Sequence, residues 1–570
     1  MSVSFGYAPD VLSTVRWTFS RALLAASLFS LSINFLMLTI PLYMLQVYDR
    51  VLRSHSLETL LSLSIIALAA LLTLALLVFV RSFLFVRLSD WMDRKLSGYL
   101  LKGAVRSALK SGYASVQCLR DLSTVRTFLS GPGIVPLLDI PWAPIFLTAI
   151  FLLHPTLGWI ALSGAILLMI LAISNELLTR HILINATDVS IEATHKAEAA
   201  VQNADVIEAM GMLPALLSRW HAESGQALNL HRKAAVRNSV LSTCSRFVRF
   251  ALQLSILGIG AFFVVEGELT GGAMISASIL MGRALAPVDV AIGSWRAAIT
   301  AYAAYQRVKQ QLASSSMYRQ ALTLPAPMGR LLIQNVTFLY PGQSEPTLQN
   351  VSFALEPGES LGVVGPAAAG KTTLARLLVG SLEPGVGHVR LDGADISLWP
   401  SEDRGHYLGY LPQDVELFRG TVRENISRWG PGDNGVIPAA RLVGAHDMVL
   451  GLPAGYETNI GRGGTALSGG QRQLVALARA VYGDPRLIVL DEPYGNLDHE
   501  AGEALIRALH DLRARGATVV IIAHRPNILQ QVDKVLVLRN GQTQAFGSRS
   551  EILPKIIAPA TAAIQQRPTG

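Results

Sequence analysis

Charged side chains are scarce in this chain of 570 residues. Only 15% of the residues are Asp, Glu, Lys or Arg, against about 25% in an average soluble protein, and 51% are hydrophobic. The apolar excess lies almost wholly before Trp295, where long uncharged runs alternate with polar segments. This composition excludes a wholly water-soluble protein, so we expect much of the first half to lie in a membrane.

Cysteine is also rare, and basic residues are not interleaved with aromatic ones. Cys118 and Cys244 have neither CxxC spacing nor a neighbouring pair of histidines, which excludes a zinc site and a disulfide framework of the usual kinds. The net charge of +8 comes without the basic and aromatic runs typical of nucleic-acid binding, so no nucleic-acid partner is expected. The excess Lys and Arg instead lies beside the apolar segments, which favours contact with membrane lipid.

Six uncharged or nearly uncharged runs predict six membrane-spanning helices. The first is too long for the apolar core of a secretory signal, which has about 7 to 15 residues. The last two are short, and Arg283 and Asp289 follow them closely. These charges lie either where the helix leaves the membrane or along a water-filled path. The predicted spans are 22–47, 60–80, 134–153, 157–174, 250–265 and 269–282.

Two long polar segments between the spans are predicted to be cytosolic helices. The first, 81–133, has nine Lys and Arg against three Asp, so the positive-inside rule places it and the N-terminus in the cytosol. The second is 175–249. The third span contains Asp139 and the prolines 136, 141 and 144, and kinks are expected where proline removes a backbone donor.

The second half of the chain contains a nucleotide-binding pattern. Residues 365–373 read Gly-Pro-Ala-Ala-Ala-Gly-Lys-Thr-Thr, between an apolar run at 361–364 that predicts a strand and a helical pattern at 373–379. In such a loop the backbone N–H groups hold phosphates, Lys371 reaches the β- and γ-phosphates, and the Thr372 hydroxyl binds Mg²⁺. Alone, the pattern would also fit a glycine-rich turn that binds nothing.

Two later stretches make the prediction more specific. Residues 467–471 read Leu-Ser-Gly-Gly-Gln, and the apolar run 487–490 ends in Asp491 and Glu492. With the phosphate loop in the same order, the region 331–553 resembles the ATP-binding cassette family, whose signature and Walker B strand have these patterns. The resemblance implies an α/β P-loop ATPase domain with ATP and Mg²⁺ as cofactors.

The same resemblance implies roles for individual residues. Glu492 would deprotonate the attacking water, His524 would be the switch histidine and Tyr340 would stack on adenine. Without the other motifs, each of these residues would better fit a structural role: Tyr340 as a packed aromatic residue, Gln413 as a surface amide and His524 as a core histidine. The full predicted set is catalytic Glu492, His524, Lys371 and Gln413; nucleotide-binding Tyr340, Gly365, Pro366, Ala367, Ala368, Ala369, Gly370, Lys371, Thr372, Thr373, Ser468, Gly469, Gly470 and Gln471; and metal-binding Thr372, Gln413 and Asp491.

Three residues depart from the family pattern. Ala368 stands where many cassettes have another glycine, and its Cβ would crowd the loop if the position needs a positive φ. Ala367 replaces a common serine. Arg462, shortly before the signature, replaces a glutamate that exporters usually carry in the segment that communicates with the membrane helices.

The membrane half carries a second resemblance. Residues 41–52 (PLYMLQVYDRVL), 138–144 (LDIPWAP), 283–289 (RALAPVD) and 291–296 (AIGSWR) are similar to the permease/ATPase of type I secretion systems, in the branch that exports proteases and lipases. The implied architecture is an all-α exporter domain of six transmembrane helices fused to the cassette. Each stretch alone would also fit a helix end at the membrane interface.

This resemblance implies ATP-driven export of an unfolded protein with a C-terminal signal across the bacterial inner membrane. The implied partners are a second copy of the chain in a homodimer, a periplasmic adaptor, an outer-membrane channel and the secreted substrate. Because only the segment 1–20 precedes the first span, we expect the core itself to recognise the cargo. The alternative is an exporter of lipid or hydrophobic drugs; a soluble cassette ATPase is excluded by the apolar half. The predicted parts are 1–20, the membrane domain 21–313, the linker 314–330, the cassette 331–553 and the tail 554–570.

Overall fold

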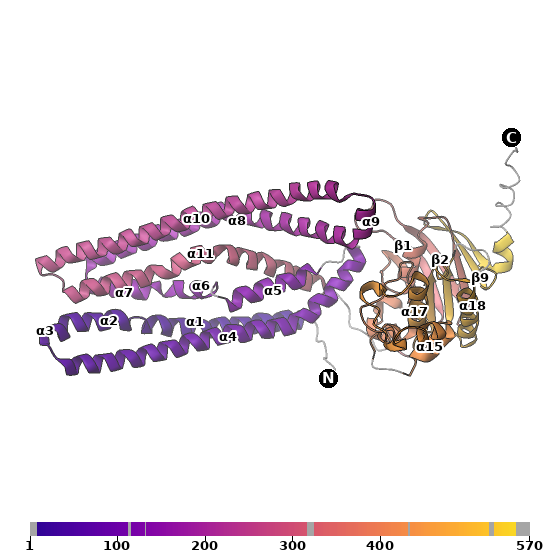
Figure 1. The fold of residues 1–570 in the computed structure, drawn as a ribbon, viewed down its shortest axis with the longest axis horizontal. Helices are drawn as coiled ribbons and strands as arrows, with labels where there is room; N and C mark the ends of the chain where they lie inside the picture. Colours follow the sequence, from indigo (N-terminus) through magenta and orange to yellow (C-terminus); the bar gives the residue numbers. More distant parts are fainter. Residues whose placement is uncertain are drawn as a thin grey trace. The chain divides into compact units, whose positions relative to one another are not determined.

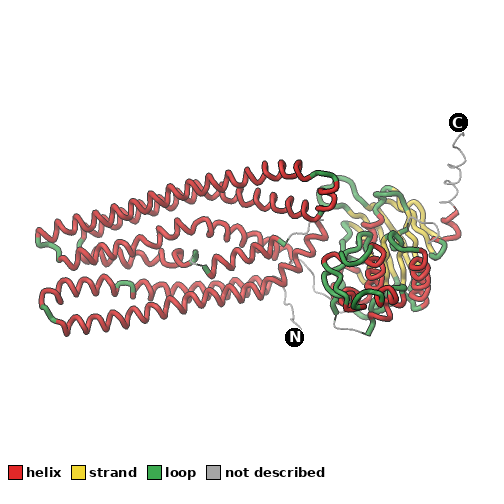
Figure 2. Tube along the Cα trace, viewed as in Figure 1, coloured by secondary structure: helices red, strands yellow, loops and turns green. Residues whose placement is uncertain are grey.

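The computed structural model describes residues 8–111, 116–131, 133–315, 324–430, 434–523 and 529–554. The chain forms two compact units. The described part of the first unit is helical and ends at residue 315, and the second unit combines strands with helices (Figure 2). The predicted tail after residue 554 and part of the predicted linker lie outside the described residues.

Long helices dominate the first unit (Figure 1). The first predicted span is interrupted at Met37 and Leu38, where α1 gives way to α2. The described elements are α1 (Ala8–Leu36), α2 (Thr39–Gln46), the π-helical turn η1 (Val47–Val51), α3 (Leu52–Ser54), α4 (Leu57–Ser111), α5 (Gln117–Ser130), α6 (Val135–Asp139), the 3-10 turn η2 (Ile140–Trp142), α7 (Ala143–Leu153), α8 (Pro155–Gln202), α9 (Ala204–Ala209), α10 (Leu213–Glu266) and α11 (Gly271–Ser315).

Five helical segments in the described residues, against the predicted six, are long and apolar enough to cross a membrane: Ser13–Ser54, Leu57–Leu109, Val135–Leu153, Pro155–Gln202 and Leu213–Glu266. The sixth predicted span lies in α11, which is not among them. Ala277, Met281 and Leu285 of α11 are fully buried, in a core that includes residues of α7, α8 and α10. A helix packed among protein neighbours does not need a lipid-compatible surface, and small residues let its backbone approach them closely.

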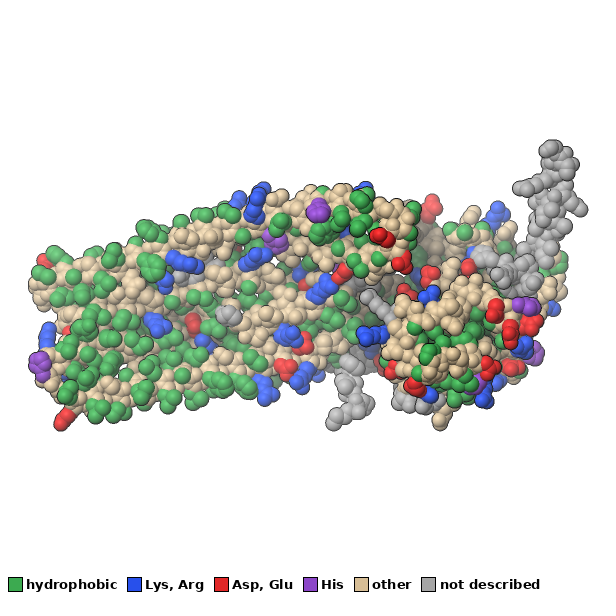
Figure 3. Space-filling view, in the orientation of Figure 1, with side chains coloured by type: hydrophobic (Ala, Val, Ile, Leu, Met, Phe, Trp, Pro, Cys, Tyr) green, Lys and Arg blue, Asp and Glu red, His purple; other side chains and the backbone are tan. Residues whose placement is uncertain are grey.

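The surface of α4 shows the opposite pattern. Leu61, Leu68 and Leu72 are 65%, 69% and 73% exposed, and the most apolar stretch of the helix has no buried residue. Hydrophobic side chains cover much of the visible face of the helical unit (Figure 3). In water such a surface would be strongly unfavourable, so this helix is suited to contact with lipid.

The three prolines of the third predicted span coincide with breaks in the helix, as predicted. Pro136 lies in the first turn of α6, Pro141 in the 3-10 turn η2 and Pro144 in the first turn of α7. Proline tolerates a first turn because the N–H that it lacks has no partner there within the helix. The segment is therefore three short pieces instead of one regular helix.

The second unit contains two sheets and surrounding helices (Figure 1). The smaller sheet is antiparallel, in the order β2 (Leu348–Leu355), β1 (Leu331–Phe338), β4 (Val386–Leu391) and β5 (Ala394–Asp395). The larger sheet has the order β10 (Gln542–Ser548), β9 (Lys534–Arg539), β3 (Ser360–Val364), β8 (Thr518–Ile522), β7 (Leu487–Asp491) and β6 (Leu408–Leu411). Only β10 pairs in the antiparallel sense in this sheet.

The larger sheet and the helix after β3 position the predicted phosphate loop. The predicted strand at 361–364 and helix at 373–379 are confirmed as β3 and α12 (Lys371–Leu378). Because β3 and β7 are parallel strands of one sheet, the loops after both strands lie at the same edge. The remaining described helices and 3-10 turns are η3 (Ile396–Leu398), α13 (Ser401–Tyr407), α14 (Val422–Ile426), α15 (Val436–Leu442), α16 (His446–Leu450), η4 (Gly455–Glu457), η5 (Arg462–Gly464), α17 (Gly469–Val481) and α18 (His499–Ala514).

Candidate functional site

The turn between β3 and α12 is built around two glycines. A Cβ at Gly365 would lie 2.3 Å from the carbonyl oxygen of Leu538, so no other residue fits there without movement of the backbone. Gly370 precedes α12 with a φ of +93°, and a Cβ there would lie 2.9 Å from the carbonyl oxygen of Thr347. The turn can therefore bring its backbone N–H groups and the start of α12 to one place, which is the geometry that binds phosphate.

Lys371, the first residue of α12, lies inside this turn. Its Nζ donates hydrogen bonds of 2.9 Å to the carbonyl oxygens of Gly365 and Pro366, and the residue is only 7% exposed. Burial lowers the pKa of the ammonium group, and the charges of Glu492 and Asp491 offset part of that effect. A buried cation held by neutral carbonyls would gain favourable interactions from an anionic ligand.

Asp491 ends β7 with its side chain buried. Neither carboxylate oxygen has a hydrogen-bond partner of ordinary geometry in the described part of the chain, and burial raises the pKa of the carboxyl group. The Thr372 hydroxyl offsets part of this rise because it lies near, and it donates to Gln413 Oε1 at 3.4 Å. Orphaned carboxylate oxygens beside a hydroxyl and an amide oxygen form an all-oxygen set that fits Mg²⁺.

Glu492 follows Asp491 in a strained backbone conformation. Its φ is +52°, and its N–H donates to the carbonyl oxygen of Ile522 on β8 at 3.1 Å. The left-handed region is unfavourable for a residue with a Cβ, and such residues persist where the surrounding structure holds them. The turn directs the Glu492 side chain to the same cavity as Lys371 and Gln413, which all three help to line.

That cavity has a volume of about 1020 Å³. It brings together most of the predicted residues of the phosphate loop with Tyr340, Gln413 and Glu492. Sequence reasoning missed Thr347, Asn540 and Gly541, which line the cavity from loops outside any motif. The one available signal was the Asn-Gly pair after β9: both residues have positive φ, and a Cβ at Gly541 would lie 2.5 Å from the carbonyl oxygen of Thr347.

Ala368 has a φ of +61°. The backbone at this position therefore has the positive φ at which a Cβ was expected to be unfavourable. Ala367 has an exposed side chain and is not among the described residues with positive φ. The two departures from the family pattern in this loop thus differ. Ala368 strains the backbone, whereas Ala367 only lacks the hydroxyl of the common serine.

Tyr340 combines the two alternatives considered for it. Its ring packs edge-on against Phe338 with ring centroids 4.9 Å apart, and its hydroxyl lies 3.4 Å from Thr373 Oγ1. It also lines the cavity. Packing in the core fixes the position of the ring at the edge of the cavity, and its stacking on adenine remains a prediction.

The predicted signature starts α17. Ser468 is the N-cap of the helix: its Oγ accepts from the N–H of Gln471, and Gln471 Oε1 accepts from the N–H of Ser468 at 2.9 Å. This capping box stabilises the helix start, where Ser468 is exposed and Gly469 and Gly470 are half-buried. Within the described residues, none of residues 468–471 lines the cavity.

Three predicted features lie outside what the structure describes. His524 is outside the described residues, and so is the side chain of Arg462. The side chain of Asp289 is likewise not described, whereas Arg283 lies half-buried in α11. The predicted roles of His524, Arg462 and Asp289 therefore stay predictions.

Comparisons with known proteins find similarity in both the membrane half and the cassette half of the chain. The family model described as ABC transporter transmembrane region matches residues 23–287, and the one described as ABC transporter matches residues 348–495. The chain is 38% identical to the type I secretion system ATP-binding protein PrsD of Rhizobium meliloti (strain 1021), over 98% of this chain and 97% of the relative.

More distant relatives point the same way. The cyclolysin secretion/processing ATP-binding protein CyaB of Bordetella pertussis is 31% identical over 92% of this chain and 75% of its own length. The alpha-hemolysin translocation ATP-binding protein HlyB of Escherichia coli is 27% identical over 94% and 77%. The structure of a bacterial Atm1-family ABC exporter with ATP bound matches with a TM-score of 0.77 at 22% identity, covering 97% of this chain and 99% of that chain, which shows the shared fold.

Proposed function

The chain belongs to the ABC transporters, among the type I secretion ATP-binding proteins, and from this premise we propose that it uses ATP hydrolysis to export a polypeptide across the bacterial inner membrane. The observation that carries the proposal is the extent of the similarity to PrsD, which covers nearly all of both chains. A cassette alone would support only an ATPase. Similarity that continues through the membrane helices supports a common type of cargo, and so weighs against the lipid or drug alternative.

In the proposed site, the residues of the cassette hold the nucleotide and position water. Backbone N–H groups of residues 367–372 and the Lys371 ammonium bind the phosphates, and Tyr340 stacks on the base. Thr372, Gln413 and Asp491 would hold Mg²⁺, which would supply charge neutralisation at the terminal phosphate. Glu492 accepts the proton of the attacking water, and we assign the switch role to His524.

A second copy of the chain would complete each site. This inference is supported by the position of residues 468–471, which do not line the described cavity although their helix start is exposed and suited to an anion. In a symmetric homodimer, the signature of each copy would close over the nucleotide held by the other. Nucleotide binding would then favour the closed dimer, and hydrolysis would release it.

The finer assignments rest on the resemblance of the membrane half. We propose that the cargo is an unfolded protease or lipase with a C-terminal signal, and that a periplasmic adaptor and an outer-membrane channel complete the path. The relatives' printed names support secretion of proteins in general. Genes next to this one that encode an adaptor and a protein with Gly-Asp-rich calcium repeats would support the finer assignment.

The test is reconstitution in proteoliposomes with an adaptor and an outer-membrane channel. A reporter polypeptide with a C-terminal secretion signal should be exported in an ATP-dependent way, and Lys371→Ala should abolish export because the phosphates lose their cation. The matched control is Lys233→Ala, which removes an exposed lysine of α10 outside either cavity and should leave export and ATP hydrolysis intact. Movement of labelled lipid or dye without dependence on the signal would overturn the proposal.

A further inference from the structure

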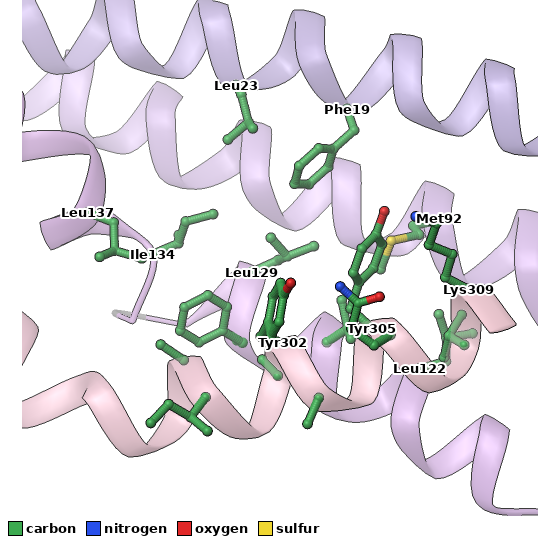
Figure 4. A pocket seen from close by; sticks show the side chains of 18 of the residues that line it. Phe19, Leu23, Met92, Leu122, Leu129, Ile134, Leu137, Tyr302, Tyr305 and Lys309 are labelled. Carbon is green, nitrogen blue, oxygen red and sulfur yellow. The ribbon is translucent and has the colours of Figure 1, made fainter. Parts of the chain in front are cut away.

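The helical unit contains a second large cavity, unrelated to the nucleotide site. It has a volume of about 950 Å³ and is lined by residues of α1, α4, α5, α6, α8 and α11. Most of its walls are apolar: Figure 4 shows Phe19 and Leu23 of α1 on one side and Tyr302 and Tyr305 of α11 on the other, and Met92 of α4 and Leu129 of α5 also line the space. A cavity of this size and composition is typical of a binding site.

The two tyrosines show that the space is open to a ligand. Tyr302 and Tyr305 are 55% and 49% exposed although they lie on an apolar wall. Other parts of the lining are firmly packed, since Met92, Leu96 and Leu122 belong to the buried core of this unit. Tyrosine offers a large apolar ring with a polar tip, so this wall can contact both apolar and polar groups of a ligand.

Most of the cavity's lining lies beyond the ends of the apolar runs, and Leu23, Ile134, Leu137 and Leu138 lie in the first turns of the predicted spans 22–47 and 134–153. On α4 it is lined by Met92 and Leu96, which follow the run that ends at Val80, and on α1 it begins at Val15, before the run that starts at Ala22. Its lining residues on α11 start at Trp295, after Arg283. With the basic segments in the cytosol, as the positive-inside rule predicts, this end of the unit faces the cytosol and not the acyl chains of the bilayer.

Cations at the lining give the cavity a charge preference. Arg16 and Lys309 form no ion pair with another residue in the described part of the chain, whereas Arg180 pairs with Glu176 at 3.4 Å. The lining therefore carries three cationic side chains and one carboxylate. A ligand with apolar groups and negative charge complements these walls, because two of the cations still lack a counter-charge.

We propose that this cavity binds an apolar segment of the transported polypeptide that also carries acidic residues, before the segment enters the membrane. The proposal rests on the proposed export of polypeptides and adds where and by what chemistry the cargo is held. Burial of its apolar side chains against α1, α5 and α11 would supply the affinity, and Arg16 and Lys309 would select for acidic neighbours. Binding at the cytosolic end would hold the cargo until the helices move.

The first experiment measures peptide binding to the full-length protein in detergent without nucleotide. The probe is a fluorescein-labelled peptide of 20 residues that contains Leu, Phe, Ser and Glu. Two matched peptides carry Lys in place of Glu, or Ser in place of Leu and Phe. Fluorescence anisotropy should show binding of the apolar acidic peptide at least tenfold tighter than binding of either matched peptide. Equal binding of all three would overturn the charge and apolar preferences.

Variants locate the binding site. Ala298→Trp fills the cavity from α11 and should weaken binding at least tenfold, whereas Gln310→Trp introduces the same residue at an exposed position of α11 outside the lining and should not. Arg16→Glu with Lys309→Glu should reverse the preference in favour of the Lys peptide, and Arg232→Glu, at an exposed site on α10, should leave it unchanged. Unchanged binding by the filled variant would overturn the proposal.

Other occupants give different results. If anionic phospholipid in micelles displaces the acidic peptide and binds in its place with equal loss on Ala298→Trp, the cavity is a lipid site and the proposal is wrong. If Ala298→Trp converts a dimer to a monomer, the cavity is covered by a second copy and the proposal is also wrong. Normal basal ATP hydrolysis by each variant checks that it is folded.

Export assays separate this inference from the proposed function. If the wild type exports the signal-bearing reporter but the filled variant exports it equally well, the cavity proposal fails and the export function stands. If the wild type binds the acidic peptide in the cavity but exports no polypeptide, the export function fails and only the binding site stands. Loss of both peptide binding and export in Ala298→Trp, but not in Gln310→Trp, supports both the cavity proposal and the export function.

Discussion

Arg81 and Asp139 form an ion pair inside the helical unit, with Nη1 of the arginine 2.8 Å from Oδ1 of the aspartate. The side chains are only 6% and 14% exposed. Arg81 also donates to Ser30 Oγ at 2.7 Å, and Asn34 Nδ2 donates to the same carboxylate oxygen at 3.2 Å. The pair thus joins α1, α4 and the end of α6, where prolines interrupt the helix. Buried charges of this kind are stable only with their partners.

Replacement of Asp139 by Asn should strongly destabilise the helical unit, because it leaves the Arg81 cation buried without a counter-charge. We expect a loss of roughly 3–5 kcal/mol in the free energy of unfolding, seen as a lower thermal unfolding midpoint in detergent. The control is Asp90→Asn, which breaks an exposed pair with Arg94 and should cost less than about 0.5 kcal/mol. A similar midpoint for both variants would contradict a structural role for the buried pair.

Replacement of Ala368 by Gly should strengthen nucleotide binding. The left-handed backbone at this position costs an alanine about 1–2 kcal/mol, and glycine avoids that cost. Because glycine is also more flexible when the loop is open, we expect a net gain of roughly 1 kcal/mol, or about fivefold in Kd. Titration with a fluorescent ATP analogue measures it. Ala367→Gly, where the backbone is unstrained, should give no gain, and equal gains at both sites would exclude strain as the cause.

Asp491→Asn should have opposite effects on stability and on metal-dependent binding. Burial raises the pKa of this carboxyl, so the ionised form is disfavoured in the folded protein. The resulting loss of stability is absent below the unfolded-state pKa, grows as the pH rises through the interval up to the folded-state pKa, and is complete above it. At neutral pH, without nucleotide or Mg²⁺, the variant should therefore have the higher unfolding midpoint, while Mg²⁺-dependent ATP binding is lost.

Scans of the unfolding midpoint from neutral pH down to about pH 4, near the unfolded-state pKa of an aspartate, check that reasoning. The difference between Asp491→Asn and the wild type should shrink toward the acidic end, because the wild-type carboxyl takes up a proton there. The control is Asp414→Asn, at an exposed site, which should show no such dependence. A lower midpoint for Asp491→Asn at every pH would mean that the carboxylate stabilises the empty site.

Glu492→Gln should stop ATP turnover while ATP binding persists. The amide preserves the size of the side chain, and Lys371 and Thr372 still hold phosphate and metal, but no carboxylate accepts a proton from water. We expect turnover to fall at least a hundredfold and the cassettes to remain closed as a dimer in ATP. Hydrolysis and nucleotide retention should be measured on one sample, with the exposed Glu500→Gln as control. Near-normal turnover would remove Glu492 from the proposed role.

Engineered cysteines test the shared site. With Cys118 and Cys244 replaced by serine, Thr372→Cys and Ser468→Cys in the same chain should cross-link between two copies in the presence of ATP, since residues 468–471 do not line the described cavity of their own chain. The expected product has twice the mass of the chain in a denaturing gel. Pairing Thr372→Cys with the exposed Arg507→Cys should give none. A product formed only within one chain would contradict the composite site.

Most residues of the nucleotide site could be predicted from the sequence, because they lie in short continuous segments. The phosphate loop is one continuous segment, and its glycines are required by a close approach of backbone atoms at Gly365 and by the positive φ at Gly370. Asp491 and Glu492 end a strand of fully apolar character, so their place at the sheet edge also followed from the sequence. The same reasoning missed Thr347 and Asn540, because surface loops carry no periodic pattern.

Tertiary structure alone decided what joins the membrane helices. Nothing in the sequence pairs Arg81 with Asp139, and nothing pairs Asp49 with Thr270, whose hydroxyl donates to that carboxylate at 2.5 Å across 221 positions of the chain. Hydropathy reports only the tendency of a segment to leave water, so it could not show that residues 273–285 of α11 are buried against α7, α8 and α10. The cavity beside Tyr302 likewise exists only because helices distant in sequence surround it, since each contributes an apolar face that no single segment reveals.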